Sequence, residues 1–168
     1  MAKNEVVYKF ETREQYLAAL DQVMPAKYIQ TRDLGQGRKH VYLPSPIKEA
    51  IADDVFHFWT VIDENYINIA NEIICTVKLN FMPNYPGAED LVCTGTAARP
   101  IQMDAKTTVA QFPGKKKKNA LEMDTPAVRI EAISNALGTL GNIFGRSLGR
   151  KLNQNTPLTP DFKIRKHE

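Results

Sequence analysis

Cysteine is scarce in this chain of 168 residues, which contains two, Cys75 and Cys93. The two do not form a CxxC pair, and no histidine cluster lies beside either of them in the sequence. This spacing gives no support for a zinc site or a disulfide framework. We interpret both residues as buried thiols on strands.

Long hydrophobic runs are also missing. No apolar run approaches the roughly 18 residues that a membrane span needs, and the first ten residues, MAKNEVVYKF, lack the apolar core of a signal peptide. We therefore expect a cytoplasmic or nuclear protein with no membrane partner. The hydrophobic fraction of 43% and the length suffice for one domain with its own core.

The chain has little excess charge, with a net charge of +3 that does not by itself indicate a polyanionic partner. The distribution is more informative, because the basic residues gather in four places: Arg38-Lys39-His40, Lys115 to Lys118, Arg146 to Lys151 and Lys163 to Lys166. Such clusters are typical of a nucleic-acid surface, and each one alone is equally typical of a solvated loop.

The first half of the chain predicts two helices around a hairpin. A helix over residues 12–23 has Thr12 as its N-cap, and a second runs over residues 47–58. Between them, two strand-like runs at residues 28–32 and 40–43 flank a glycine-containing turn, which is a hairpin pattern.

The sequence of residues 60–101 has a pattern typical of β-structure. It predicts one long strand, or two with a bend near Asn71, followed by a strand over residues 91–99 in which Gly95 indicates a bulge or a close backbone approach. With the hairpin, this predicts one antiparallel sheet of about four or five strands. Residues 103–124 read as a loop with four consecutive lysines.

The strongest pattern is a long helix predicted over residues 125–152, with Thr125 as N-cap and Pro126 at the first helical position. Two stripes recur at helical spacing. The apolar stripe is Ile130, Ile133, Leu137, Leu140, Phe144 and Leu148, and the glycine stripe is Gly138, Gly141, Gly145 and Gly149. The glycines indicate that another backbone comes close. Asn142, Arg146 and Arg150 share the remaining face.

The predicted fold class is α+β: an antiparallel sheet with a hairpin, short helices and one long C-terminal helix packed across it. Residues 1–152 form the single domain of this prediction. Residues 153–168 form a polar, proline-broken tail.

Two segments of this chain resemble the ring-forming single-strand annealing proteins of the Rad-fifty-two type. The hairpin segment PAKYIQTRDLGQGRKHVYL matches the family's hairpin at Pro25, Tyr28, Ile29, Arg32, Gly35, Gly37 and Tyr42. The A-x-x-x-A-L-x-x-L-G-x-x-F-G-x-x-L-G helix matches the family's last helix. The order of elements agrees from about residue 16 to residue 152, and the resemblance is to compact phage or bacterial members.

The resemblance implies ATP-independent annealing of single-stranded DNA during homologous recombination and repair, by a homo-oligomeric ring without a cofactor or catalytic residue. It places Arg32 and Tyr42 in an inner DNA groove, and Lys117 and Lys118 at an outer site. Together with the charge clusters, this predicts the following DNA-binding residues: Arg32, Arg38, Lys39, Tyr42, Lys115, Lys116, Lys117, Lys118, Arg146 and Arg150. A phage member would act in the host cytoplasm, with a host single-strand binding protein as a possible partner.

One departure from the family pattern concerns the last helix, where the family carries basic residues that face the inner groove. Here the corresponding positions are Gly138, Thr139 and Asn142. The charge of the groove is therefore weaker or comes from elsewhere, and Arg146 and Arg150 are the candidate substitutes.

Two other functions compete with annealing. A metal-dependent nuclease would use carboxylates such as Asp53, Asp54 and Asp63 with Lys78, and Asp53, Asp54 and His57 have a helical spacing that suits a metal. A structural ring protein would use its basic patches for solubility alone. In these readings Arg32 is an ion-pair residue at the core edge and Tyr42 is a core residue.

Overall fold

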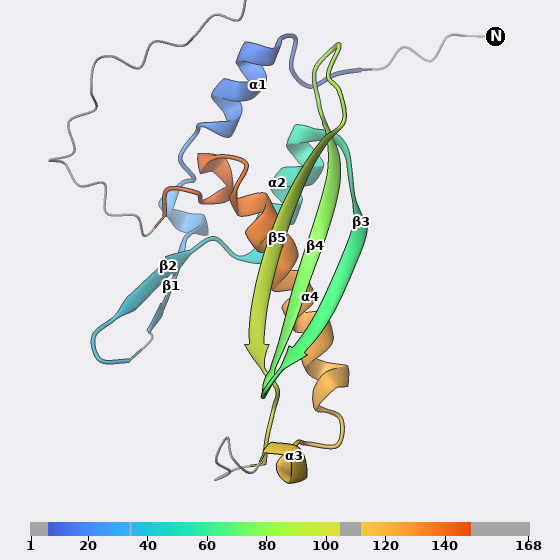
Figure 1. The fold of residues 1–168 in the computed structure, drawn as a ribbon. Coiled ribbons are helices and arrows are strands. Elements are labelled where there is room, and N and C mark those ends of the chain that lie inside the picture. The colour runs from blue at the N-terminus through green and yellow to red at the C-terminus, as the bar shows by residue number, and fades with distance from the viewer. Residues whose placement is uncertain (1–6, 34, 105–111, 149–168) are drawn as a thin grey trace, which may run out of the picture.

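A three-stranded antiparallel sheet is the centre of the computed structural model, which describes residues 7–33, 35–104 and 112–148. Its strands are β3 (Phe56–Ile69), β4 (Glu72–Pro83) and β5 (Leu91–Pro100), in the spatial order β3-β4-β5 (Figure 1). The predicted strands are confirmed, with the chain reversing at Ala70, whose φ is +53°. The fold is α+β, with antiparallel sheets and a long helix towards the C-terminus.

Helix α4 (Ala120–Gly138) lies across one face of this sheet (Figure 1). Alternate residues of β4 are buried beneath it, as a two-residue period requires: Ile73, Cys75, Val77, Leu79 and Phe81. Gly95 on β5 brings the two backbones together. A Cβ atom there would lie 2.2 Å from the Ala132 carbonyl oxygen and 2.3 Å from the Ala136 nitrogen. The close approach predicted at Gly95 is confirmed.

The buried face of α4 agrees with the predicted stripe at Ile133 and Leu137 and differs from it at Ile130. Ile130 is 46% exposed, whereas Val128, Ala132 and Ala136 are fully buried. The close contact at Gly95 explains the change, because a helix backbone that touches a strand backbone has room only for small side chains between them.

The predicted start of the long helix at residue 125 is wrong. Helix α4 begins at Ala120 with Asn119 at the N-cap, and Pro126 lies inside the helix. The buried Asp124 carboxylate accepts hydrogen bonds from the Gln102 backbone nitrogen at 2.9 Å and from its side-chain Nε2 at 3.0 Å. This contact connects the early part of the helix to the segment after β5. No local sequence pattern predicts it.

The predicted end of the helix at residue 152 is also wrong. Helix α4 ends at Gly138, where the Thr139 hydroxyl donates to the Ala136 carbonyl at 2.7 Å, and a short 3₁₀ helix η3 (Asn142–Phe144) follows. Glycine has low helix propensity, so closely spaced glycines favour such an end. Gly145 has a φ of +82°, which suits the turn after η3.

The close backbone approach expected of the glycine stripe occurs within this chain. A Cβ on Gly141 would lie 2.5 Å from the Leu20 carbonyl oxygen, at the end of α1 (Arg13–Leu20). The predicted N-cap of α1 is confirmed, since the Thr12 hydroxyl accepts from the Gln15 nitrogen at 3.3 Å. The helix ends at Leu20 rather than at residue 23. Gly149 lies outside the described residues.

The hairpin is confirmed, but the expected single sheet of four or five strands is wrong. Strands β1 (Gln30–Asp33) and β2 (Lys39–Tyr42) follow a short 3₁₀ helix, η1 (Ala26–Tyr28), and form a separate two-stranded sheet. Figure 1 shows the hairpin projecting beside α4 rather than extending the central sheet. Sequence patterns indicate how many strands a chain forms. Which strands pair with one another depends on tertiary packing, and the sequence pattern does not show it.

Helix α2 (Ser45–Val55) is shorter than its predicted range, because β3 begins at Phe56. Phe58 and Trp59 therefore lie on β3 and not on a helix. A short helix α3 (Phe112–Lys115) ends at the first of the four consecutive lysines. Within residues 7–33, 35–104 and 112–148, no helix has the length and apolarity to cross a membrane.

Candidate nucleic-acid interface

One face of the β1-β2 hairpin carries the predicted groove residues. Arg32 pairs with His40 and Gln30 pairs with Tyr42 across the hairpin, and side chains two residues apart on a strand share a face. The His40 and Tyr42 rings are stacked, with centroids 5.7 Å apart and planes at 5°. The Tyr42 hydroxyl donates to Gln30 Oε1 at 3.0 Å. The result is an aromatic surface beside an exposed guanidinium.

This face borders a hollow of about 440 Å³ between the hairpin and α4. Its lining includes Arg32, His40 and Tyr42 from the hairpin, Lys48 from α2, and Ser134 and Asn135 from α4. A second hollow of about 470 Å³ shares Lys48 and Asn135 with the first and extends to Gly138, Thr139 and Arg146. We call the two hollows together the hairpin groove.

Lys48 lies where the two hollows meet, and sequence reasoning missed it. Its Nζ donates to the Ser134 carbonyl oxygen at 2.9 Å, and burial lowers the pKa of this half-buried ammonium. A signal for this position exists in the sequence. Lys48 stands four and seven residues before Ala52 and Val55, the buried residues of α2, so it lies on the helix face that turns towards the core.

Positive charge predominates along the hairpin groove. Arg32, Lys48 and Arg146 line it, and Glu131 is the acidic residue of its lining. The Glu131 carboxylate accepts from Arg99 Nη1 at 3.0 Å, and Arg99 Nε also lies 3.6 Å from Asp124 Oδ1, so this arginine of β5 offsets the charge of Glu131 in part. A groove of this kind attracts an anion and contacts it through several cations.

The other predicted basic residues of the hairpin are not brought into the groove lining. Lys39 pairs with Asp33 and alternates with His40, so its side chain points to the opposite face of the hairpin. Arg38 lies in the turn, where its nitrogen donates to the Gly35 carbonyl at 3.1 Å. The cluster Arg38-Lys39-His40 is therefore contiguous in sequence and divided in space.

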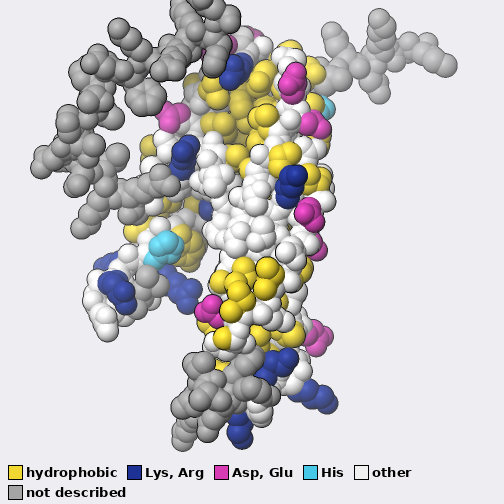
Figure 2. Space-filling model, in the orientation of Figure 1, with side chains coloured by type: hydrophobic (Ala, Val, Ile, Leu, Met, Phe, Trp, Pro, Cys, Tyr) yellow, Lys and Arg dark blue, Asp and Glu magenta, His cyan; other side chains and the backbone are white. Residues whose placement is uncertain are grey.

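Lys115, Lys116, Lys117 and Lys118 lie at the other end of α4 from the hairpin groove. Lys116 forms a β-bridge with Met103, and Lys117 donates from its backbone nitrogen to the Gln102 carbonyl at 3.1 Å. The helix rises about 1.5 Å per residue, which puts this segment roughly 20 Å from Ser134. Figure 2 shows dark blue side chains both at the hairpin and around α3. Within the residues that the structure describes, the hairpin groove and the lysine segment are thus separate basic regions.

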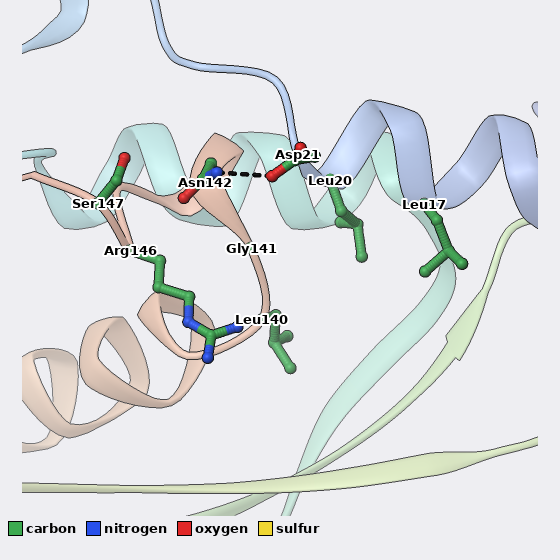
Figure 3. Close-up of a pocket in the computed structure, with 8 residues that line it drawn as sticks. All are labelled: Leu17, Leu20, Asp21, Leu140, Gly141, Asn142, Arg146 and Ser147. Carbon is green, nitrogen blue, oxygen red and sulfur yellow. Dashed lines mark hydrogen bonds between the residues drawn. The ribbon is translucent and has the colours of Figure 1, made fainter. Parts of the chain in front are cut away.

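The expectation that Asn142 and Arg146 share a helix face is wrong, because both follow the end of α4. Asn142 Nδ2 donates to Asp21 Oδ1 at 2.6 Å, in a hollow between α1 and η3 (Figure 3). The Arg146 side chain extends away from that pair in Figure 3, and Arg146 also lines the hairpin groove. Arg150 lies outside the described residues.

The proposed metal spacing on one helix is wrong, because His57 belongs to β3. Asp53 accepts from Trp59 Nε1 at 2.7 Å, and Asp54 pairs with Lys9. In the described part of the chain, no group of three or more His, Cys, Asp or Glu side chains is arranged to hold a metal ion. Asp63 and Lys78 face each other across β3 and β4, remote from α2 in the strand register.

The two cysteines lie on strands, Cys75 buried and Cys93 half-buried. Burial raises the pKa of both thiols, that of Cys93 to about 11, so both remain protonated at neutral pH.

Comparisons with known proteins found no match: neither the scan against protein-family models nor the search of curated proteins returned a hit.

Proposed function

We propose that this protein binds single-stranded DNA in the hairpin groove and promotes the annealing of complementary strands without ATP, as a step of homologous recombination. The observation that carries the proposal is the lining of the groove. Arg32 and Tyr42, selected from the sequence, line it beside His40, and the groove continues past Lys48 to Arg146.

Each part of the groove matches a requirement of single-strand binding. Cations that contact phosphates hold the backbone without reading the sequence. The stacked rings of His40 and Tyr42 offer a surface on which a base can stack, which is a common way to hold single strands. The strand is held by its backbone, and its base edges remain free to pair with a complement.

The lysine segment at residues 115–118 supports a second part of the proposal. It is exposed and stands roughly 20 Å along α4 from the groove. That separation suits capture of a second strand while the first occupies the groove. Nuclease activity is a weaker alternative, because Asp53 and Asp54 are engaged with Trp59 and Lys9.

Binding should be nearly independent of base sequence and strongly dependent on salt. Several phosphate contacts release counterions on binding, so affinity should fall about tenfold or more between roughly 50 and 200 mM salt. Fluorescence anisotropy with labelled dT and mixed-sequence oligonucleotides measures this directly. The same protein should then accelerate pairing of complementary oligonucleotides in the absence of ATP and divalent metal. A flat salt response, or no acceleration of pairing, would contradict the proposal.

The proposal includes assembly into a homo-oligomeric ring. Strands β3 and β5 are the edges of the central sheet, and its uncovered face exposes large apolar residues such as Ile67, Ile69 and Val92. Figure 2 shows apolar patches on this side of the molecule. Exposed edges and patches of this kind favour association between subunits.

Light scattering should therefore give a mass several times the 18.9 kDa of one chain at micromolar concentration. A monomer, both alone and with a long oligonucleotide, would rule out the ring.

A further inference from the structure

The Lys48 ammonium has fewer partners than its three donors allow. It donates to the Ser134 carbonyl oxygen, and no carboxylate of the described residues lies within 4.0 Å of its Nζ. Glu131 lines the same groove but is bonded to Arg99. A half-buried ammonium without a counter-ion is costly, and an anion that enters the groove removes that cost.

The residues around Lys48 leave it open to the groove. Ser134 of α4 accepts the hydrogen bond from Lys48 Nζ, and a Cβ on Gly138, one turn further along the helix, would lie 3.1 Å from the same nitrogen. A side chain at this position would therefore displace the ammonium by a few tenths of an ångström. Lys48 is also among the residues shared by both hollows of the groove. Its charge therefore lies at the junction, between Arg32 in one hollow and Arg146 in the other.

We propose that Lys48 is the central phosphate-binding residue of the hairpin groove, and that the missing side chain of Gly138 makes room for its ammonium. The inference rests on the proposed function. It explains how the groove carries charge although Gly138 and Thr139, at the end of α4, stand at positions where the family that this chain resembles carries basic residues. In this arrangement the Lys48 side chain extends from α2 to α4, and its ammonium binds a phosphodiester that lies between the hairpin and α4.

The test compares three variants in anisotropy titrations with a labelled dT oligonucleotide over a range of salt concentrations. Lys48→Met keeps the length of the side chain and removes its charge. Lys48→Arg keeps the charge. Lys27→Met removes one charge from η1, where Lys27 is exposed outside the groove lining with its ammonium over the Tyr28 ring, and serves as the matched control.

Loss of one phosphate contact should weaken binding by Lys48→Met about tenfold, because hydrogen bonds to charged groups contribute that much. The slope of log K against log salt should fall by about 0.7, the value for one contact to a single strand. Lys48→Arg should keep the parent slope, and Lys27→Met should match the parent in both affinity and slope. An unchanged slope in Lys48→Met would overturn the role of Lys48 while leaving DNA binding intact.

Acetylation footprinting of the unmodified protein tests the same point independently of how the variants fold. With the dT oligonucleotide bound, mass spectrometry should show Lys48 protected from acetylation and Lys27 modified as in the free protein. Equal modification of Lys48 with and without DNA would overturn the inference. If the parent protein binds no oligonucleotide at any salt concentration, the proposed function itself fails, and the role of Lys48 fails with it.

Discussion

Replacing Gly95 by alanine should destabilise the protein more than the same change at any other glycine of the described residues. The new Cβ would lie 2.2 Å from the Ala132 carbonyl oxygen and 2.3 Å from the Ala136 nitrogen, which are backbone atoms and cannot rotate away. Relief requires α4 to lift from β5, which opens the contacts of Val128, Ala132 and Ala136 with the sheet. Overpacking of this kind costs roughly 3 kcal/mol or more of unfolding free energy.

Chemical denaturation measures this effect, with Gly114→Ala as the matched control. Gly114 lies in α3, and a Cβ there meets nothing within 4 Å, so the control should unfold at nearly the parent midpoint. A Gly95→Ala protein as stable as the control would show that α4 does not sit against β5 as described.

The second large effect distinguishes the role of the hairpin groove in binding a first strand from the role of the lysine segment in strand pairing. Truncating Arg32 to alanine should weaken binding of one oligonucleotide about tenfold, because it removes a charge-assisted phosphate contact from the groove. Replacing Lys115, Lys116, Lys117 and Lys118 together by serine should leave that affinity within about threefold, since the lysines lie roughly 20 Å away along α4. The serine variant should instead slow the pairing of complementary strands.

Two assays on the same proteins distinguish these defects: anisotropy for first-strand binding and a dye-displacement assay for pairing. Lys27→Ala is the matched single-charge control, because Lys27 lies on η1 with its ammonium over the Tyr28 ring and outside the groove lining. If Arg32→Ala binds and pairs strands as the parent does, the groove is misassigned. If the serine variant pairs strands normally, the lysine segment is only a solvated loop.

Local signals were sufficient for the elements whose shape is decided locally. Thr12 predicts the start of α1, and the glycine-containing turn predicts the hairpin; the structure confirms both. Helix α4 shows where local signals fail. Its start depends on Asp124 bonding to Gln102, and its end lies beside the Gly141 contact with Leu20, which is distant in sequence. Tertiary contacts of this kind override a plausible cap such as Thr125.

The residues of the hairpin groove, like the elements of the fold, could be predicted from the sequence in part. The resemblance of the hairpin to that of the annealing family selects Arg32 and Tyr42, and the register of β1 with β2 places both on one face. The sequence predicts Arg146 as a DNA-binding residue on a helix face, and that placement is wrong. Arg146 lines the groove because the chain turns at Gly145. Lys48 was missed because a lone lysine at the start of α2 looks like a surface residue until the facing Gly138 is known.

Photo-cross-linking tests the central claim, that the hairpin groove is the DNA site, most directly. The full chain is irradiated with a single oligonucleotide that carries iododeoxyuridine, and the linked peptides are identified by mass spectrometry. A base stacked at the groove should link to the hairpin peptide that contains His40 and Tyr42, and excess unlabelled single strand should abolish the link. Cross-links confined to the central sheet or to the lysine segment, with none on the hairpin, would contradict the account.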